Sequence, residues 1–268
     1  MPPLPPLLAA TLIKRYKRFL ADVTLEGGEE LTAHCANPGS MRGLTDEGSG
    51  AWLSDSYNPR DPKTHKRKLR YSLELIALHA TLSRPAALVC VNTLRANGVA
   101  RAGVEAGAVP ALRELTLRPE APWRGGEEEA RLDFALYPPA PHASPTPIGY
   151  LEVKSATLSL APHEASFPDA VTERGQRHLR ALMEIKRAGL RAALLFVVMR
   201  TDARSFRPAH EIDPRYAALL REARDAGVEI YAHACELSTT EMTLSGALPI
   251  VWDHLPEPPE PPEPSKPT

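Results

Sequence analysis

The chain has few cysteines, and those it has form no pattern. Three occur among 268 residues, at positions 35, 90 and 235. Widely spaced cysteines in odd number argue against a disulfide framework and against a cysteine-based metal site, and they indicate reduced, mostly buried thiols. We therefore expect a cytoplasmic protein.

Long hydrophobic runs and a secretory signal are also missing. The apolar stretch near the N-terminus is too short to span a bilayer, and its positive charges follow it, which is the reverse of a secretory signal. We expect no membrane partner. The sequence also lacks a Walker loop, a glycine-rich dinucleotide turn and a G-x-S-x-G elbow, the motifs of several common nucleotide-binding and hydrolytic folds.

Charge of one sign is not in excess. The sequence has 32 Lys and Arg against 33 Asp and Glu, a net charge of −1, so the whole chain shows no preference for a polyanionic partner. Residues 1–85 differ, because they hold 12 Lys and Arg against 9 Asp and Glu, a net of +3. Aromatic residues make up only 6% of the chain, which argues against a sugar-binding platform.

The pattern of hydrophobic residues changes near residue 85. Residues 11–76 resemble about five short strands with a Gly-Gly hairpin turn at 27–28, which predicts a small barrel of the OB type. The following part alternates strand and helix patterns, with helices expected within 92–109, 169–189 and 214–227. We therefore predict an all-β domain over 1–85, an α/β domain with parallel strands over 86–250, and a disordered tail rich in proline and glutamate over 251–268.

Two charged residues interrupt a strand that is otherwise typical of a protein core. Glu152 and Lys154 alternate with apolar residues in GYLEVKS and share one face of the strand. If this strand pairs as a hairpin with ARLDFAL, Asp133 and Glu152 can lie near one strand end. Two convergent carboxylates can hold Mg²⁺ or Mn²⁺, and a lysine beside them can act on water or phosphate. Glu105, on the preceding helix, could add a third carboxylate.

This arrangement predicts metal-assisted phosphodiester cleavage, but the pattern also has a simpler interpretation. Glu152 and Lys154 could form an ion pair on a solvent-facing sheet, with Asp133 matched to Arg131.

Basic residues suggest where a nucleic acid would bind. The segment KRYKRF interleaves four cations with Tyr16 and Phe19, a combination that holds phosphates and stacks bases. For this segment the alternative is an edge strand protected by charge. The loop RDPKTHKRKLR is a second basic cluster, and the alternative there is a solvated loop. Arg42 could close over an anion held by the backbone amides of a turn, although a plain tight turn is the simpler interpretation. The helix start near Arg174 could face another anion or be only an exposed polar face. The candidate DNA-binding residues are Lys14, Arg15, Lys17, Arg18, Arg42, Lys66, Arg67, Lys68, Arg174 and His178.

Several blocks of the sequence resemble the sugar fermentation stimulation protein A family. The matching blocks run in order over about residues 11–250 and include LIKRYKRFLADVTL, HCANPGSMRGL, RLDFAL, LEVKSATL and FPDAVTERGQRHL. The resemblance implies an N-terminal OB-like barrel followed by a PD-(D/E)XK nuclease-like domain. It also implies a DNA-binding protein linked to the regulation of maltose metabolism.

The resemblance also implies roles for particular residues. It places Asp133, Glu152 and Lys154 on the nuclease motif, with Glu105 on the preceding helix and Gln176 on the following one. Where the family usually has Asn-Thr-Gly-Ser-Met, this chain has NPGSM.

Three hypotheses about function follow. The first is a protein that binds DNA largely without sequence preference and has a nuclease-like site, active or vestigial. The second is a transcriptional regulator whose nuclease-like domain is only structural, although no helix-turn-helix pattern is present. The third is a sugar or metabolite binder. The sequence predicts no oligomeric state.

Overall fold

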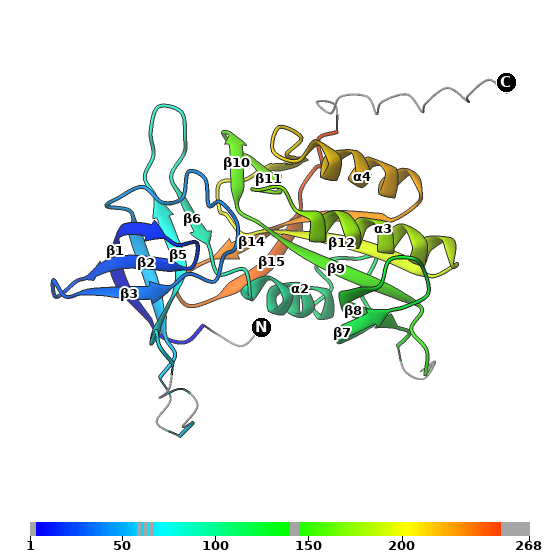
Figure 1. Cartoon of the computed structure of the whole chain (residues 1–268), viewed down its shortest axis with the longest axis horizontal. Coiled ribbons are helices and arrows are strands. Elements are labelled where there is room, and N and C mark those ends of the chain that lie inside the picture. The colour runs from blue at the N-terminus through cyan, green and yellow to red at the C-terminus, as the bar shows by residue number, and fades with distance from the viewer. Residues whose placement is uncertain (1–3, 58–59, 62–63, 65–66, 140–144, 253–268) are drawn as a thin grey trace, which may run out of the picture.

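The computed structural model describes residues 4–57, 60–61, 64, 67–139 and 145–252. The candidate residue Lys66 and positions 253–268 of the predicted disordered tail lie outside the described residues. The chain forms two parts, a barrel and an α/β domain, which lie side by side (Figure 1).

The N-terminal part is a closed barrel, as the sequence predicted. Its strand order is β3-β2-β1-β4-β5-β6, and a bridge between His34 and Ser72 joins β3 to β5. The turn between β2 and β3 contains Gly28 at φ 84°, a backbone conformation that glycine adopts without steric penalty. The strands are β1 (Leu7–Tyr16), β2 (Leu20–Leu25), β3 (Glu30–His34), β4 (Gly50–Asp55), β5 (Tyr71–Leu78) and β6 (Ala87–Cys90).

The barrel ends later than the predicted boundary at residue 85. Strand β6 pairs with β5 through Leu75–Cys90 and three further pairs, so the barrel includes Cys90. The short apolar run ALVC contributes buried residues on both of its faces, which hides the alternation expected of a barrel strand.

The second part contains a mixed six-stranded sheet in the order β15-β14-β12-β9-β8-β7. Its central strands β9, β12 and β14 are parallel, as predicted, and the outer pairings are antiparallel. The strands are β7 (Thr116–Trp123), β8 (Ala130–Tyr137), β9 (Gly149–Ala156), β12 (Arg191–Val198), β14 (Glu229–Leu237) and β15 (Met242–Ala247). Strand β7 begins only at Thr116, because residues 110–114 form turns.

A small sheet that the sequence did not predict joins this domain near the barrel. It consists of β10 (Leu158–Ala161), β11 (Glu164–Phe167) and β13 (Ser205–Pro208). These strands are too short to give a clear period of two, which explains why the sequence pattern missed them.

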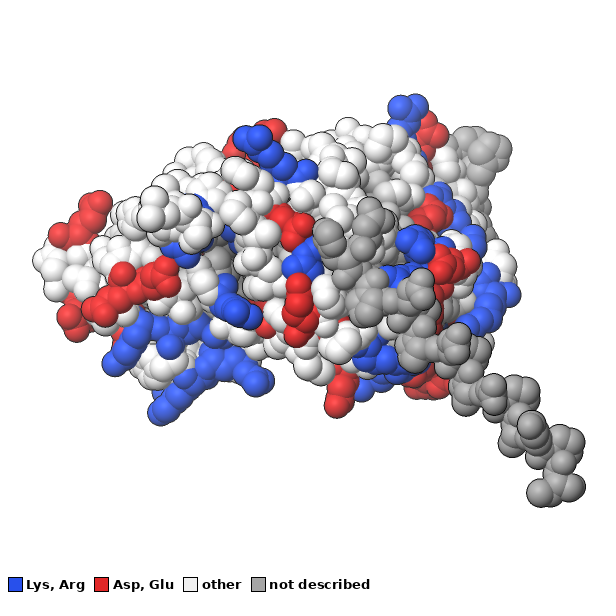
Figure 2. Space-filling model, turned by 90° about the horizontal axis from the view of Figure 1, so that it is seen from above, with Lys and Arg blue, Asp and Glu red and all other residues white. Residues whose placement is uncertain are grey.

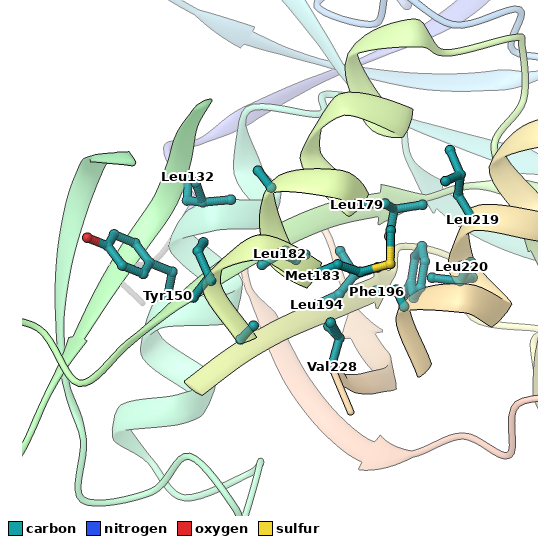
Figure 3. Packing of buried hydrophobic residues seen from close by; sticks show 14 of the residues in the cluster. Leu132, Tyr150, Leu179, Leu182, Met183, Leu194, Phe196, Leu219, Leu220 and Val228 are labelled. Carbon is teal, nitrogen blue, oxygen red and sulfur yellow. The ribbon is translucent and has the colours of Figure 1, made fainter. Parts of the chain in front are cut away.

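Helices cover both faces of the six-stranded sheet (Figure 1). Helix α2 (Arg95–Glu105) packs on one face, and α3 (Glu173–Arg187) and α4 (Pro214–Asp225) pack on the other. Helix α3 starts after Thr172, whose side chain accepts a hydrogen bond from the amide of Gly175. Figure 3 shows Leu179 and Leu182 of α3 packed with Phe196 of β12 and Leu220 of α4. Burial of such a side chain stabilises the fold by about 1.5–3 kcal/mol.

The end of the α/β domain stays attached to its core. The amide of Val251 donates to the carbonyl of Phe206, and Arg224 lies 4.6 Å from the ring centroid of Trp252. Residues 251 and 252 therefore do not belong to a disordered tail as predicted. No helix in the described part of the chain is long and apolar enough to cross a membrane.

Several sets of hydrogen bonds join the barrel to the α/β domain, and two of them involve charged side chains. In the first, the Ser40 hydroxyl donates to the carbonyl of Asp169 at 2.7 Å and the Met41 amide donates to its carboxylate at 3.1 Å. A Cβ on Gly39 would lie 2.1 Å from Oδ2 of Asp169, so only glycine allows this approach. In the second, Arg95 at the start of α2 donates to the buried Glu74 of β5 at 2.9 and 2.7 Å.

Candidate functional site

A cavity of about 460 Å³ lies where the barrel meets the α/β domain. The barrel contributes the turn 37–39, and the α/β domain contributes the ends of β8 and β9 together with the loop that leads into α3. We call it the carboxylate cavity, because Asp133, Glu152 and Lys154 all line it. The structure therefore brings together the three residues that the sequence singled out.

The two carboxylates meet where β8 and β9 separate. The ladder pairs Phe134 with Leu151, and continuing its register sets Asp133 opposite Glu152. The amide of Asp133 donates to Oε2 of Glu152 at 3.3 Å, and the amide of Val153 donates to Oδ2 of Asp133 at 2.8 Å. Asp133 thus lies in the opening between the strands.

Glu152 is buried and surrounded by cationic and polar partners. Its side chain is 3% exposed, its Oε1 accepts from Lys154 Nζ at 2.5 Å, and it contacts Nδ1 of His178. Burial acts to raise the pKa of Glu152, but Lys154 and His178 outweigh it and lower the pKa to about 2. The alternative of a solvent-facing ion pair is wrong, since Glu152 is buried and Arg131 pairs with Glu120 instead of Asp133.

Asp133 has the opposite shift. Burial raises its pKa, and the nearby negative charge of Glu152 raises it further. Its Oδ1 accepts from Nδ2 of Asn97 at 2.7 Å. A bound cation would relieve the repulsion between the two carboxylates.

His178 is buried beside Glu152 and Lys154 and does not lie on an exposed face. It is 6% exposed, and its Nδ1 lies 3.1 Å from Lys154 Nζ as well as against Glu152. Nε of Arg174 donates to Nε2 of His178 at 3.4 Å, which favours the tautomer with the proton on Nδ1. The sequence pattern does not distinguish His178 from its exposed neighbour Arg177.

Two predicted site residues lie elsewhere. Gln176 donates from Nε2 to both carboxylate oxygens of Asp213 at 3.1 Å, so it links α3 to the N-cap of α4. Glu105 ends α2, is about half exposed and pairs with Arg101. Asn97 of the same helix reaches Asp133 instead, and Glu105 lies eight residues further along, about 12 Å away at 1.5 Å per residue.

The donor set for a metal is correspondingly small. The described residues contain no group of three or more His, Cys, Asp and Glu side chains placed to hold a metal ion. Three carboxylates line the carboxylate cavity, but that of Asp169 accepts from the amide of Met41. The hydroxyls of Ser155 and Ser166 lie along the cavity wall. Both hydroxyl oxygens are buried without a hydrogen-bond partner, and Ser166 is 1% exposed. Unsatisfied hydroxyls in a cavity wall are free to bind a ligand.

Arg15 has a structural role in place of the predicted contact with DNA. Its guanidinium donates to the carbonyls of Arg18, Asn37, Gly39 and Ser40 at 2.6–3.2 Å. It therefore holds the turn that forms one wall of the carboxylate cavity.

The same turn has two interpretations from sequence, an anion-binding nest of backbone amides or a plain tight turn. The carboxylate of Asp169 accepts from the amide of Met41, and Oδ1 of Asn37 accepts from the amide of Gly39. Partners within the chain thus take up these amides. Arg42 is exposed and lines a separate cavity of about 360 Å³ with Arg84 and Arg200.

The other three cations of the segment 14–18 are exposed. Lys17 and Arg18 lie in the turn after β1 at positive φ, and Lys14 is 63% exposed with its Nζ 3.6 Å from Asp22. Figure 2 shows Lys and Arg side chains gathered at one edge of the barrel end of the molecule, beside a group of acidic side chains. Lys14, Lys17 and Arg18 stay candidates for phosphate contacts.

A second cavity of about 550 Å³ adjoins the barrel, and we call it the barrel cavity. Arg67, Lys68 and His34 line it, along with Arg95 at the start of α2. Leu94 lines both this cavity and the carboxylate cavity, so the two are neighbours. Arg174 is exposed and lines the carboxylate cavity.

The fold and the cavity define a two-domain protein with an OB barrel followed by a PD-(D/E)XK nuclease-like domain. Residues 13–91 match the SfsA N-terminal OB domain, and residues 94–241 match the sugar fermentation stimulation protein RE domain. The chain therefore belongs to the sugar fermentation stimulation protein family. Both the predicted family and the predicted fold class are confirmed.

Similar proteins cover nearly the whole chain. A sugar fermentation stimulation protein homolog of Magnetococcus marinus is 46% identical over 88% of this chain and 93% of its own length. A homolog of Jannaschia sp. is 40% identical over 91% of this chain and 95% of its own length. The structure of Pyrococcus furiosus SfsA in complex with Ca²⁺ superposes with a TM-score of 0.75 at 26% identity, covering 92% of this chain and 97% of that one.

Proposed function

We propose that this protein binds DNA across the junction of its two domains and cleaves a phosphodiester bond with the help of a divalent cation. The observation that carries the proposal is the convergence of Asp133, Glu152 and Lys154 in one cavity, with cations on the barrel beside it. Contacts made mainly by Lys and Arg to the backbone predict binding with little sequence preference and a steep dependence on salt.

The residues present fit a hard divalent cation such as Mg²⁺ or Mn²⁺. Asp133 and Glu152 offer carboxylate oxygens, the ligands that Mg²⁺ prefers, and each carboxylate has room for acceptor contacts beyond those it makes. Two protein ligands suffice for Mg²⁺, which usually keeps several waters. The Ca²⁺ in the Pyrococcus furiosus relative supports a cation of this kind. When bound, the cation would supply Lewis-acid polarisation of the phosphate.

Lys154 and Arg174 in the cavity, and Asn97 beside it, have separate tasks in this proposal. Lys154, held by Glu152, places a positive charge where negative charge develops on the phosphate. Arg174 holds a neighbouring phosphate at the cavity wall, and Asn97 fixes the orientation of Asp133.

A role in regulating maltose metabolism is a further part of the proposal. It rests on the resemblance to the family and on the family's name, and it would act through DNA binding in the cytoplasm. A regulator whose second domain is only structural would bind DNA in the same way but would not cleave it.

Cleavage assays with purified protein test the proposal. Labelled single-stranded, duplex and branched DNA would be incubated with Mg²⁺, Mn²⁺ or no cation. We expect cation-dependent cleavage by the wild type, none by Lys154→Met, and loss of both cleavage and cation binding in Asp133→Asn. Glu105→Gln is the matched control, because it removes a carboxylate that the structure places away from the cavity, and it should behave like the wild type.

Each alternative outcome has a clear meaning. DNA binding without cleavage under any cation would favour the structural interpretation of the second domain. A calorimetric titration in which Asp133→Asn binds Mn²⁺ as the wild type does would refute the metal site.

A further inference from the structure

Leu94 is an exposed leucine at the boundary between the two cavities. It is 76% exposed and lies in the segment that leads from the barrel into α2. Six large hydrophobic residues are exposed in the described part of the chain, and two of them, Leu94 and Val171, line the carboxylate cavity. Leu94 also lines the barrel cavity.

The backbone that carries Leu94 is fixed on both sides. The amide of Leu94 donates to Oδ1 of Asn92 at 3.1 Å, and the Thr93 hydroxyl donates to the carbonyl of Ala36 at 2.9 Å. Arg95 is held by Glu74 with two hydrogen bonds. The leucine therefore projects from a rigid support, which a side chain needs in order to insert between stacked groups.

Cationic side chains lie on both sides of Leu94, and the carboxylates of the carboxylate cavity lie on one side. The carboxylate cavity offers Lys154, Arg174 and the unpartnered hydroxyl of Ser166, and the barrel cavity offers Arg67 and Lys68. A strand that crosses from one cavity to the other would have its phosphates held on each side, and a base step would face Leu94. Apolar side chains such as leucine insert at base steps and unstack them.

We propose that Leu94 acts as a wedge between two adjacent nucleotides of the bound strand. One nucleotide lies in the carboxylate cavity, and its neighbour lies in the barrel cavity. The substrate class that follows is DNA with an unstacked or unpaired nucleotide next to the bond that is cut. This inference rests on the proposed function, because it requires that DNA binds at the junction.

The test uses short duplexes in which 2-aminopurine replaces every adenine of one strand, so that the binding register does not matter. The fluorescence of 2-aminopurine rises when the base is unstacked. Ca²⁺ would replace Mg²⁺ in this assay, so that the duplex can bind without being cut. We expect the wild type to raise the fluorescence and Leu94→Ala to lose most of that rise. Leu82→Ala is the matched control, since Leu82 is a fully exposed leucine that lines neither cavity.

A second measurement compares substrates. Unstacking a base step costs a few kcal/mol. Leu94→Ala should therefore cleave fully paired duplex about tenfold more slowly than the wild type does. A mismatch in the duplex should restore most of the rate, because a mispaired base unstacks more easily. The thermal midpoint of Leu94→Ala should equal that of the wild type, since the side chain is exposed.

The outcomes separate this inference from the proposed function. Normal binding of duplex by anisotropy, with equal fluorescence from Leu94→Ala and the wild type, would refute the wedge alone. Failure of the wild type to bind any DNA would refute the proposed function and the wedge with it.

Discussion

Glu74 joins the two domains, and its replacement by glutamine should destabilise the whole protein. The side chain is 1% exposed in β5 and accepts hydrogen bonds from Ser54, Asn92 and Arg95. Glutamine has the same shape but only one acceptor oxygen, and its amide group would face the guanidinium of Arg95. The variant Glu74→Gln therefore leaves a partly buried cation without its counter-charge.

The expected loss of unfolding free energy follows from this geometry. Removing one partner of a buried ion pair costs about 3–5 kcal/mol. Because the Arg95 side chain is 29% exposed, water can solvate it in part, so we expect about 3 kcal/mol, near the lower end of that range. With a urea m-value of about 3 kcal/mol/M, the midpoint of unfolding should fall by about 1 M.

The assay is urea unfolding followed by circular dichroism, with Glu105→Gln as the control. The Arg101–Glu105 pair is about half exposed on both sides, and such pairs contribute about 0.3–0.5 kcal/mol. The double variant Glu74→Gln with Arg95→Met should recover part of the loss, because it removes the unpaired charge. A midpoint for Glu74→Gln no lower than that of Glu105→Gln would refute the reasoning.

Three further predictions concern the residues around the carboxylate cavity. The pKa of Glu152 is about 2 against an ordinary 4.5. Its contribution to stability is therefore complete above pH 4.5 and is lost as the pH falls toward 2. Glu152→Gln should make the urea midpoint of unfolding less dependent on pH over that range. Gly39→Ala should lower the thermal midpoint by several degrees, because the new Cβ meets Asp169 at 2.1 Å; an unchanged midpoint would contradict the domain contact. Arg15→Ala should lower stability by about 1–3 kcal/mol, since the carbonyls of Asn37 and Gly39 lose a donor in partly buried hydrogen bonds, whereas Lys17→Ala should leave stability unchanged and reduce the salt dependence of DNA binding by about one contact.

The sequence was sufficient for the local features of the fold. Alternation in β8 and β9 predicted a hairpin and placed Glu152 and Lys154 on one face. Helical patterns predicted α3 and α4 within 169–189 and 214–227. These features depend on residues close together in the chain, so they can be inferred from a short window of sequence.

The composition of the site depended on packing between distant segments. The sequence predicted that α2 would face Asp133, but only the way the helix packs decides which of its turns comes near, and that turn carries Asn97 instead of Glu105. In the same way, the docking of α3 on β9 brings His178 to Glu152 and directs Gln176 to Asp213.

Charge gave the least reliable guidance from sequence alone, because exposure decides what a charged residue does. Arg15 and Lys17 belong to one basic cluster, yet Arg15 binds carbonyls inside the molecule and Lys17 is exposed. The sequence by itself determined the family, the two-domain fold and the strand that carries Glu152 and Lys154. Only the tertiary structure decided which polar groups share the carboxylate cavity, because that depends on contacts between residues such as Gly39 and Asp169, which are far apart in the chain.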